Sequence, residues 1–159
     1  MTHVLSMNRA GRERTVLIVD DYPSVLAWAS RAFVRDGWHV LTANSSAEAL
    51  DAWAVAHRDG RRIQLLVTDL ELPDLDGPSL AMALRDKDPQ LCVIGITGHA
   101  ERGAGWHGTL LNRTAFFQKP MTAAELLAAA NGLTGATLGD DGELCPLDPR
   151  DEPQRATGA

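Results

Sequence analysis

The sequence predicts an α/β domain with a doubly wound, five-stranded parallel sheet and helices on both faces. Short runs of apolar and β-branched residues alternate with segments of helical character between residues 14 and 133, and this alternation is typical of strand–helix–strand units. Several runs, among them Val16–Val19 and Leu65–Val67, are apolar without interruption, which indicates parallel strands covered on both faces. Right-handed crossovers between such strands place helices on either side of the sheet.

Five runs have the length and composition of strands, and in chain order they are Thr15–Asp20, Trp38–Ala43, Ile63–Asp69, Leu91–Thr97 and Ala115–Lys119. The segments between them begin as helices do. Pro23 stands at a first-turn position, where proline is tolerated. Ser45 with Glu48 has the spacing of a capping box, and so has Thr122 with Glu125. Apolar residues then recur at helical spacing, first as Leu26, Ala29 and Phe33 and later as Leu80, Ala83 and Leu84.

The composition excludes several classes of protein. A chain of 159 residues that is 45% apolar suits one α/β domain, and no apolar run approaches the ~18 residues of a membrane helix. Cys92 and Cys145 are the only cysteines, so we expect no disulfide framework and a cytoplasmic protein. The formal net charge of −6 argues against direct nucleic-acid binding, because no basic excess is available for phosphates.

The two ends differ in composition from the domain, which we expect to span residues 14–133. Residues 1–13 contain no apolar stretch of signal-peptide length, and we expect a flexible leader. Residues 134–159 hold six acidic residues against Arg150 and Arg155 and are rich in Gly and Pro. Because this segment has no apolar period, we expect it to be disordered, as either a solvated tail or a docking segment.

Polar side chains stand at four of the five expected strand ends. The first strand finishes at Asp20-Asp21, the third at Asp69, the fourth at Thr97 and the fifth at Lys119. Any one of these has a structural explanation, such as helix capping or a solvated strand end. In open parallel sheets, however, the carboxyl ends of the strands form the ligand-binding edge, so matched chemistry at four ends favours a functional site.

Three carboxylates at one edge repel one another, because two unit charges about 4 Å apart cost roughly 4 kcal/mol at an effective dielectric of about 20. Such a cluster takes up protons or binds a cation. Oxygen ligands with room for water suit Mg²⁺ better than zinc. A carboxylate beside Mg²⁺ and a lysine can accept a phosphoryl group, since both cations neutralise charge on its oxygens.

At this point the sequence resembles the receiver domain of two-component response regulators, over residues 14–133. The resemblance rests on Asp20-Asp21 after Val-Leu-Ile-Val, on Asp69-Leu-Glu-Leu-Pro-Asp-Leu-Asp-Gly77, on Thr97 after Val-Ile-Gly-Ile, and on Lys119-Pro120 after Phe116. It implies the flavodoxin-like fold with strand order 2-1-3-4-5.

The resemblance also implies roles for the acidic residues. Asp69 corresponds to the phosphoacceptor. Asp21 resembles the direct ligand of Mg²⁺ (or Mn²⁺), and Asp20 the ligand that acts largely through water. Asp69 and the backbone carbonyl of Glu71 complete the protein's share of the metal ligands.

Three further positions match the family's phosphoryl-binding and switch residues. Thr97 resembles the hydroxyl that engages the phosphoryl group, and Lys119 resembles its ion-pair partner. Phe116 resembles the aromatic residue whose rotamer follows the hydroxyl. The resemblance implies a cis peptide bond between Lys119 and Pro120, against the low base rate of cis X–Pro bonds.

The segment 98–113 departs from the family pattern. The family has its fourth helix here, but Gly103, Gly105 and Gly108 each lower helix propensity by up to about 1 kcal/mol relative to alanine. We therefore expect a short or irregular helix.

The functional hypothesis is a signalling phosphoacceptor rather than an enzyme, whose only reactions are its own Mg²⁺-dependent phosphorylation and dephosphorylation. It would take its phosphoryl group from a histidine kinase or a histidine phosphotransfer protein. It would signal by binding a protein partner or by forming a phosphorylation-dependent dimer. A phosphate-independent receiver-like interaction module is the alternative. A phosphohydrolase with an aspartyl nucleophile ranks last, because Asp20-Asp21-Tyr22 lacks the Asp-x-Asp spacing such an enzyme needs on its first strand.

Overall fold

The computed structural model describes residues 13–98 and 113–136. In chain order its elements are β1 (Thr15–Val19), α1 (Pro23–Arg35), β2 (His39–Ala43), α2 (Ser46–Arg58), β3 (Leu65–Asp69), α3 (Gly77–Lys87), β4 (Cys92–Thr97), β5 (Thr114–Gln118) and α5 (Ala123–Ala136). The five strands form one parallel sheet in the order β2-β1-β3-β4-β5. The predicted fold class and strand order are confirmed.

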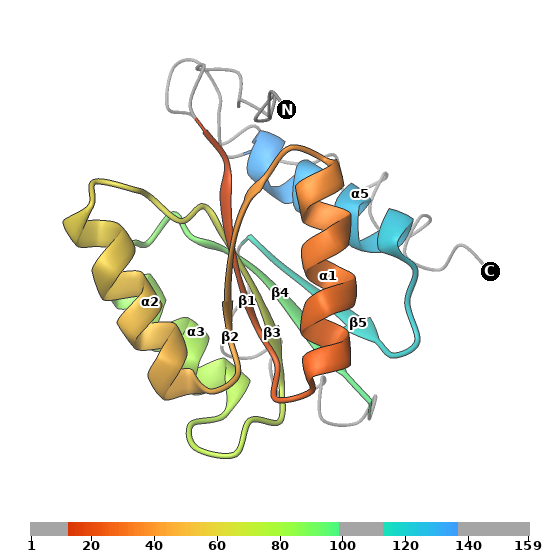
Figure 1. Cartoon of the computed structure of the whole chain (residues 1–159), viewed down its shortest axis with the longest axis horizontal. Coiled ribbons are helices and arrows are strands. Elements are labelled where there is room, and N and C mark those ends of the chain that lie inside the picture. Colours follow the sequence, from red (N-terminus) through yellow and green to blue (C-terminus); the bar gives the residue numbers. More distant parts are fainter. Residues whose placement is uncertain (1–12, 99–112, 137–159) are drawn as a thin grey trace.

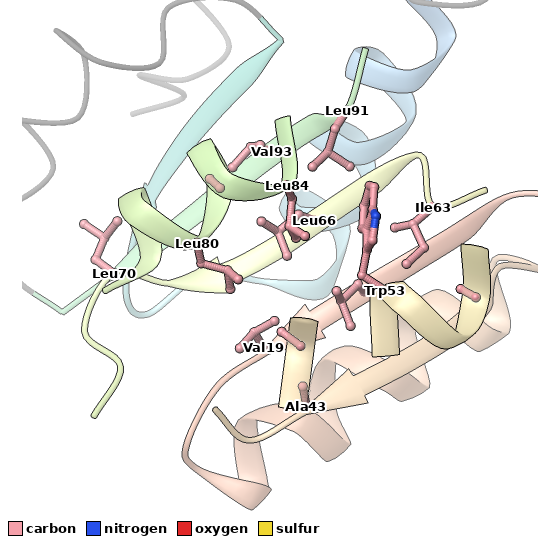
Figure 2. Packing of buried hydrophobic residues seen from close by; sticks show 14 residues of the cluster. Val19, Ala43, Trp53, Ile63, Leu66, Leu70, Leu80, Leu84, Leu91 and Val93 are labelled. Carbon is pink, nitrogen blue, oxygen red and sulfur yellow. The ribbon is translucent and has the colours of Figure 1, made fainter. Parts of the chain in front are cut away.

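The sheet is covered on both faces. Helices α1 and α5 lie against one face, and α2 and α3 lie against the other (Figure 1). Alternate residues of β1 serve the two layers, because side chains of a strand point to opposite faces. Val16 and Ile18 pack with residues of α1 and α5, whereas Leu17 and Val19 pack with residues of α2 and α3. Figure 2 shows the second layer, in which Leu80 and Leu84 of α3 and Trp53 of α2 meet the sheet.

The helices begin where the sequence indicates. The Ser45 hydroxyl accepts a hydrogen bond from the Glu48 N–H at 3.2 Å, and Pro23 occupies the first turn of α1. At α5 the capping box is reciprocal, since Glu125 N–H donates to the Thr122 hydroxyl and Thr122 N–H donates to the Glu125 carboxylate. These bonds satisfy amide groups that have no partner inside the helix.

The strand bounds differ from the predicted ones by one or two residues. Strands β1 and β5 end one residue earlier, β2 and β4 begin one residue later, β3 begins two residues later and β5 begins one residue earlier. Asp20 and Lys119 follow β1 and β5, although each still donates its backbone N–H to the neighbouring strand. Regular pairing of β3 with β1 starts at Leu65. Just before it, the Gln64 side chain accepts from Thr15 N–H at 2.7 Å, and the Gln64 N–H donates to the Thr15 carbonyl at 3.1 Å.

Helix α5 continues to Ala136, past the expected domain boundary at residue 133. The buried Thr134 belongs to this helix and donates its hydroxyl proton to the Ala130 carbonyl at 2.7 Å. The expected leader (apart from Glu13), the rest of the acidic tail and the expected fourth helix lie outside the described residues. Among the helices that are described, none is both long and apolar enough to cross a membrane.

Candidate functional site

Three carboxylates meet where the sequence predicts an acidic site, at the carboxyl edge of the sheet. Asp20 and Asp21 follow β1, and Asp69 ends β3, the neighbouring strand. One oxygen from each carboxylate lies within 4.8 Å of the other two. Asp20 and Asp69 are 2% and 6% exposed, whereas Asp21 faces solvent. The cluster therefore has a buried floor and one open side.

Backbone amides hold the two buried carboxylates in place. Asp20 Oδ1 accepts from Tyr22 N–H at 2.9 Å, and Asp69 Oδ1 accepts from Glu71 N–H at 3.1 Å. In each case an N–H group of the loop that follows the strand donates to one carboxylate oxygen. Because only one oxygen of each group is engaged by these amides, the second oxygen of each is directed to other partners.

Lys119 supplies the positive charge of the site. Its Nζ lies 3.5 Å from Asp20 Oδ2 and 3.5 Å from Asp69 Oδ2, so one ammonium group serves both buried carboxylates. The Lys119 backbone N–H donates to the Thr97 carbonyl at 2.7 Å, which fixes the lysine against the end of β4. The Lys119–Pro120 peptide bond is cis, as the family resemblance implies.

The pKa of Asp20 shows how the charges balance. Burial raises this pKa above its ordinary value, and the neighbouring Asp69 carboxylate raises it further. The Tyr22 N–H and the Lys119 ammonium act in the opposite direction without cancelling the effect of burial. Two buried carboxylates with one lysine are therefore short of positive charge, and a cation that binds here relieves the remaining repulsion.

The donor set fits a hard divalent cation. All three side chains offer oxygen, and the exposed Asp21 leaves one side open to water, in keeping with the preference of Mg²⁺ for a few carboxylates plus water. No group of at least three His, Cys, Asp or Glu side chains elsewhere among residues 13–98 and 113–136 comes together in this way.

The other predicted residues surround this cluster at different depths. Thr97 is buried at the end of β4 and is paired in register with Gln118, next to Lys119. Glu71 is exposed in the loop after β3, and its N–H binds Asp69. Phe116 is half-buried and pairs with Gly95, so it lies further back along β5 and packs against the layer of α2 and α3. Thr97 and Glu71 thus adjoin the acidic cluster, and Phe116 lies behind it.

Two further residues of this region were not predicted from the sequence. Tyr22 places its ring 5.8 Å from Lys119 Nζ. Asp74 accepts from Ser46 N–H at 3.1 Å and from Ala47 N–H at 2.9 Å, which ties the β3–α3 loop to the first turn of α2. These hydrogen bonds hold the pKa of Asp74 below its ordinary value. The helix start at Ser45 was recognisable, but the sequence does not show which distant carboxylate caps it.

Comparison with known proteins decides the family. Residues 16–131 match the response regulator receiver domain. The chain belongs to this family. It is 31% identical over 140 residues to the probable transcriptional regulatory protein TcrX of Mycobacterium tuberculosis, and the match covers 86% of this chain and 58% of TcrX. It is 34% identical over 140 residues to the transcriptional regulatory protein PrrA of Mycobacterium leprae, covering 84% of this chain and 57% of PrrA. This receiver chain thus spans little more than half the length of these relatives.

Solved receivers have the same architecture. A response regulator receiver protein of Sinorhizobium medicae superposes with a TM-score of 0.68 at 27% identity, covering 77% of this chain and 95% of that one. A CheY-like receiver domain of Methanospirillum hungatei gives a TM-score of 0.63 at 26% identity, covering 76% and 93%. The chain is therefore a receiver domain of the two-component signalling type, with an acidic pocket formed by Asp20, Asp21 and Asp69.

Proposed function

We propose that this receiver accepts a phosphoryl group on Asp69 and transmits the signal by binding a protein partner. The observation that supports this most is the placement of Asp69. It ends the central strand β3, lies with Asp20 and Asp21 in one oxygen cluster, and has the Lys119 ammonium 3.5 Å from its Oδ2. A nucleophile with a cation on one side and a metal-binding cluster on the other suits phosphoryl transfer.

In the proposed step a carboxylate oxygen of Asp69 attacks phosphorus and forms an acyl phosphate. The P–N bond of a phosphohistidine donor breaks, and its electron pair stays on the imidazole, which takes a proton from solvent. Lys119 neutralises part of the charge on the transferred oxygens. Because Asp69 is already held by the Glu71 N–H, its carboxylate is oriented before the donor arrives.

Asp20, Asp21, Asp69 and the Glu71 carbonyl would hold the divalent cation, Mg²⁺ or Mn²⁺. When bound, the cation supplies positive charge that offsets the phosphoryl oxygens. The exposed Asp21 is the carboxylate most accessible to an incoming hydrated ion. Added positive charge would also offset the burial that raises the pKa of Asp20.

Thr97 and Phe116 would carry the signal away from the site. Thr97 ends β4, the neighbour of β3, and its carbonyl accepts from the Lys119 N–H, so its hydroxyl would engage a phosphoryl group on Asp69. Phe116 lies behind Thr97 on β5 and packs against the layer of α2 and α3. A shift of Thr97 would therefore change the space into which the Phe116 ring can turn. A two-state element of this kind converts a local charge into a change of surface.

The phosphodonor would be a histidine kinase or a histidine phosphotransfer protein, as membership of the family suggests. The downstream partner would be a protein, or a second copy of the phosphorylated receiver.

Titration with beryllofluoride and Mg²⁺, which together mimic the phosphorylated state, tests the proposal. Amide NMR shifts are expected at Asp69, Thr97 and Phe116 in the wild type and not in Asp69→Asn. Asp51→Asn, an exposed position on α2, is the matched control and should respond as the wild type does. A wild-type spectrum that does not change would contradict phosphoacceptor function and favour the phosphate-independent interaction module.

A further inference from the structure

A groove of about 990 Å³ lies between α2 and α3, at the amino ends of the strands, whereas the acidic site lies at their carboxyl ends. Its lining includes the buried Trp53 and Ile63, which lie side by side in Figure 2. Around these apolar residues stand Arg61, Arg62 and Lys87. An apolar floor beneath basic side chains suits a segment that combines aliphatic and acidic residues.

The basic residues are only partly neutralised by the domain itself. Arg61 pairs with Glu13 at 2.8 Å and Arg62 pairs with Asp88 at 2.9 Å. Lys87 is exposed, and no carboxylate of residues 13–98 or 113–136 lies within ion-pair distance of it. Three basic side chains thus face two carboxylates, those of Asp88 and Glu13, and the groove keeps a net positive charge.

The chain contains a segment of complementary composition. Residues 137–159 hold all six acidic residues of the tail, and these surround the pair Leu144 and Leu147. The segment follows Ala136, at the end of α5. Near that end the Leu133 carbonyl accepts from the thiol of Cys92, the first residue of β4. The tail therefore starts at the same end of the strands as the groove, and it has to pass from the face covered by α5 to the face covered by α2 and α3. At ~3.5 Å per extended residue, the eight residues from Ala136 to Leu144 reach about 28 Å.

We propose that the acidic tail of this chain docks in the groove. Leu144 and Leu147 occupy the apolar floor at Trp53, and the neighbouring carboxylates face Arg62 and Lys87. Tethering favours this occupant over a free partner, because a short linker gives an effective concentration in the millimolar range. Docking at this edge leaves the acidic site at the opposite edge uncovered.

Cys145 provides the test, because it lies between the two leucine positions and the other cysteine, Cys92, is buried. A nitroxide label on Cys145 of the full ¹⁵N-labelled chain should broaden the Trp53 indole and the Gly60 and Ile63 amide signals. Cys145→Ser should take up no label. Lys87→Glu should remove at least half of the broadening, and Arg31→Glu, an exposed charge reversal on α1, should leave it unchanged. The broadening should also fall at about 1 M salt, where the Debye length is about 3 Å.

A second variant changes only the tail, so it leaves the folded domain as it is. Leu144→Ser with Leu147→Ser should reduce the broadening at Trp53 while Cys145 keeps its label. No broadening at the groove, or broadening of another face that is insensitive to Lys87→Glu, would overturn the proposal. Equal broadening in a mixture of nitroxide-labelled ¹⁴N chains with nitroxide-free ¹⁵N chains would overturn it as well, because the occupant would then be the tail of a second copy.

Discussion

At the scale of single residues, the acidic site is short of positive charge. Asp20 and Asp69 are buried and share the Lys119 ammonium, which lies 3.5 Å from each. Lys119 therefore has two effects that oppose each other in the unphosphorylated protein. It stabilises the buried carboxylates, and it repels any divalent cation that binds to the same oxygens.

Lys119→Met is accordingly expected to strengthen Mg²⁺ binding. Removing the competing ammonium should lower the dissociation constant about 10-fold, which corresponds to about 1.4 kcal/mol. Isothermal titration calorimetry at about pH 8, well above the ordinary carboxylate range, measures this without competition from protons. Lys87→Met makes the same substitution at the far edge of the sheet and should leave the affinity unchanged. Unchanged or weaker binding by Lys119→Met would show that the lysine does not oppose the cation.

At the scale of elements, the β3–α3 loop is held by α2. Asp74 accepts the Ser46 and Ala47 N–H groups, and the Ser46 hydroxyl donates to the Leu75 carbonyl at 2.6 Å. The position is also favourable because the amino end of a helix carries partial positive charge. The loop that contains Glu71, and that starts at the proposed phosphoacceptor, is thereby fixed at a second point.

Asp74→Asn is expected to lower the melting temperature at pH 7. The hydrogen bonds from the Ala47 and Ser46 N–H groups of α2 hold the pKa of Asp74 below its unfolded value of 3.8. The carboxylate therefore stabilises the fold above the unfolded pKa, and this stabilisation is lost as pH falls through the folded pKa. The difference in melting temperature between wild type and Asp74→Asn should shrink below about pH 3.8. Asp51→Asn, on the helix whose first turn Asp74 binds, serves as the control. A difference that stays constant with pH would contradict the assignment.

The capping box of α5 gives a second prediction at this scale. Thr122→Ala removes the hydroxyl that accepts the Glu125 N–H and should lower the free energy of unfolding by about 1 kcal/mol. Urea denaturation measures the change. Ser24→Ala, in the first turn of α1 where no side chain caps the helix, should cost far less. Equal losses in the two variants would mean that the α5 cap contributes nothing specific.

At the scale of the whole molecule, the sheet separates two surfaces of opposite charge. The acidic cluster occupies the carboxyl edge, and the groove with Arg61, Arg62 and Lys87 occupies the opposite edge. Strand direction dictates this arrangement, because all five strands are parallel and each helix returns the chain to the starting edge.

The layers and the acidic cluster could be predicted from the sequence because each depends on local patterns, whereas the strand order came from the family resemblance. Uninterrupted apolar runs predict buried parallel strands, and parallel strands bring Asp20, Asp69 and Lys119 to one edge. The bonds from Asp74 to α2 could not be predicted, because they join residues 27 and 28 positions apart and no periodic pattern marks them. The expected domain boundary at residue 133 falls inside α5, because Gly132 and Gly135 weaken the helical signal there although Thr134 is buried within the helix.

Trapping the phosphorylated side chain tests most directly whether Asp69 is the phosphoacceptor. The receiver is incubated with acetyl phosphate and Mg²⁺ and then reduced with borohydride, which converts an aspartyl phosphate into homoserine. Peptide fragmentation by mass spectrometry locates the converted residue. Homoserine is expected at position 69 alone, only when both donor and Mg²⁺ are present. Homoserine at Asp20 or Asp21, or a phosphoryl adduct that persists in Asp69→Asn, would contradict the assignment.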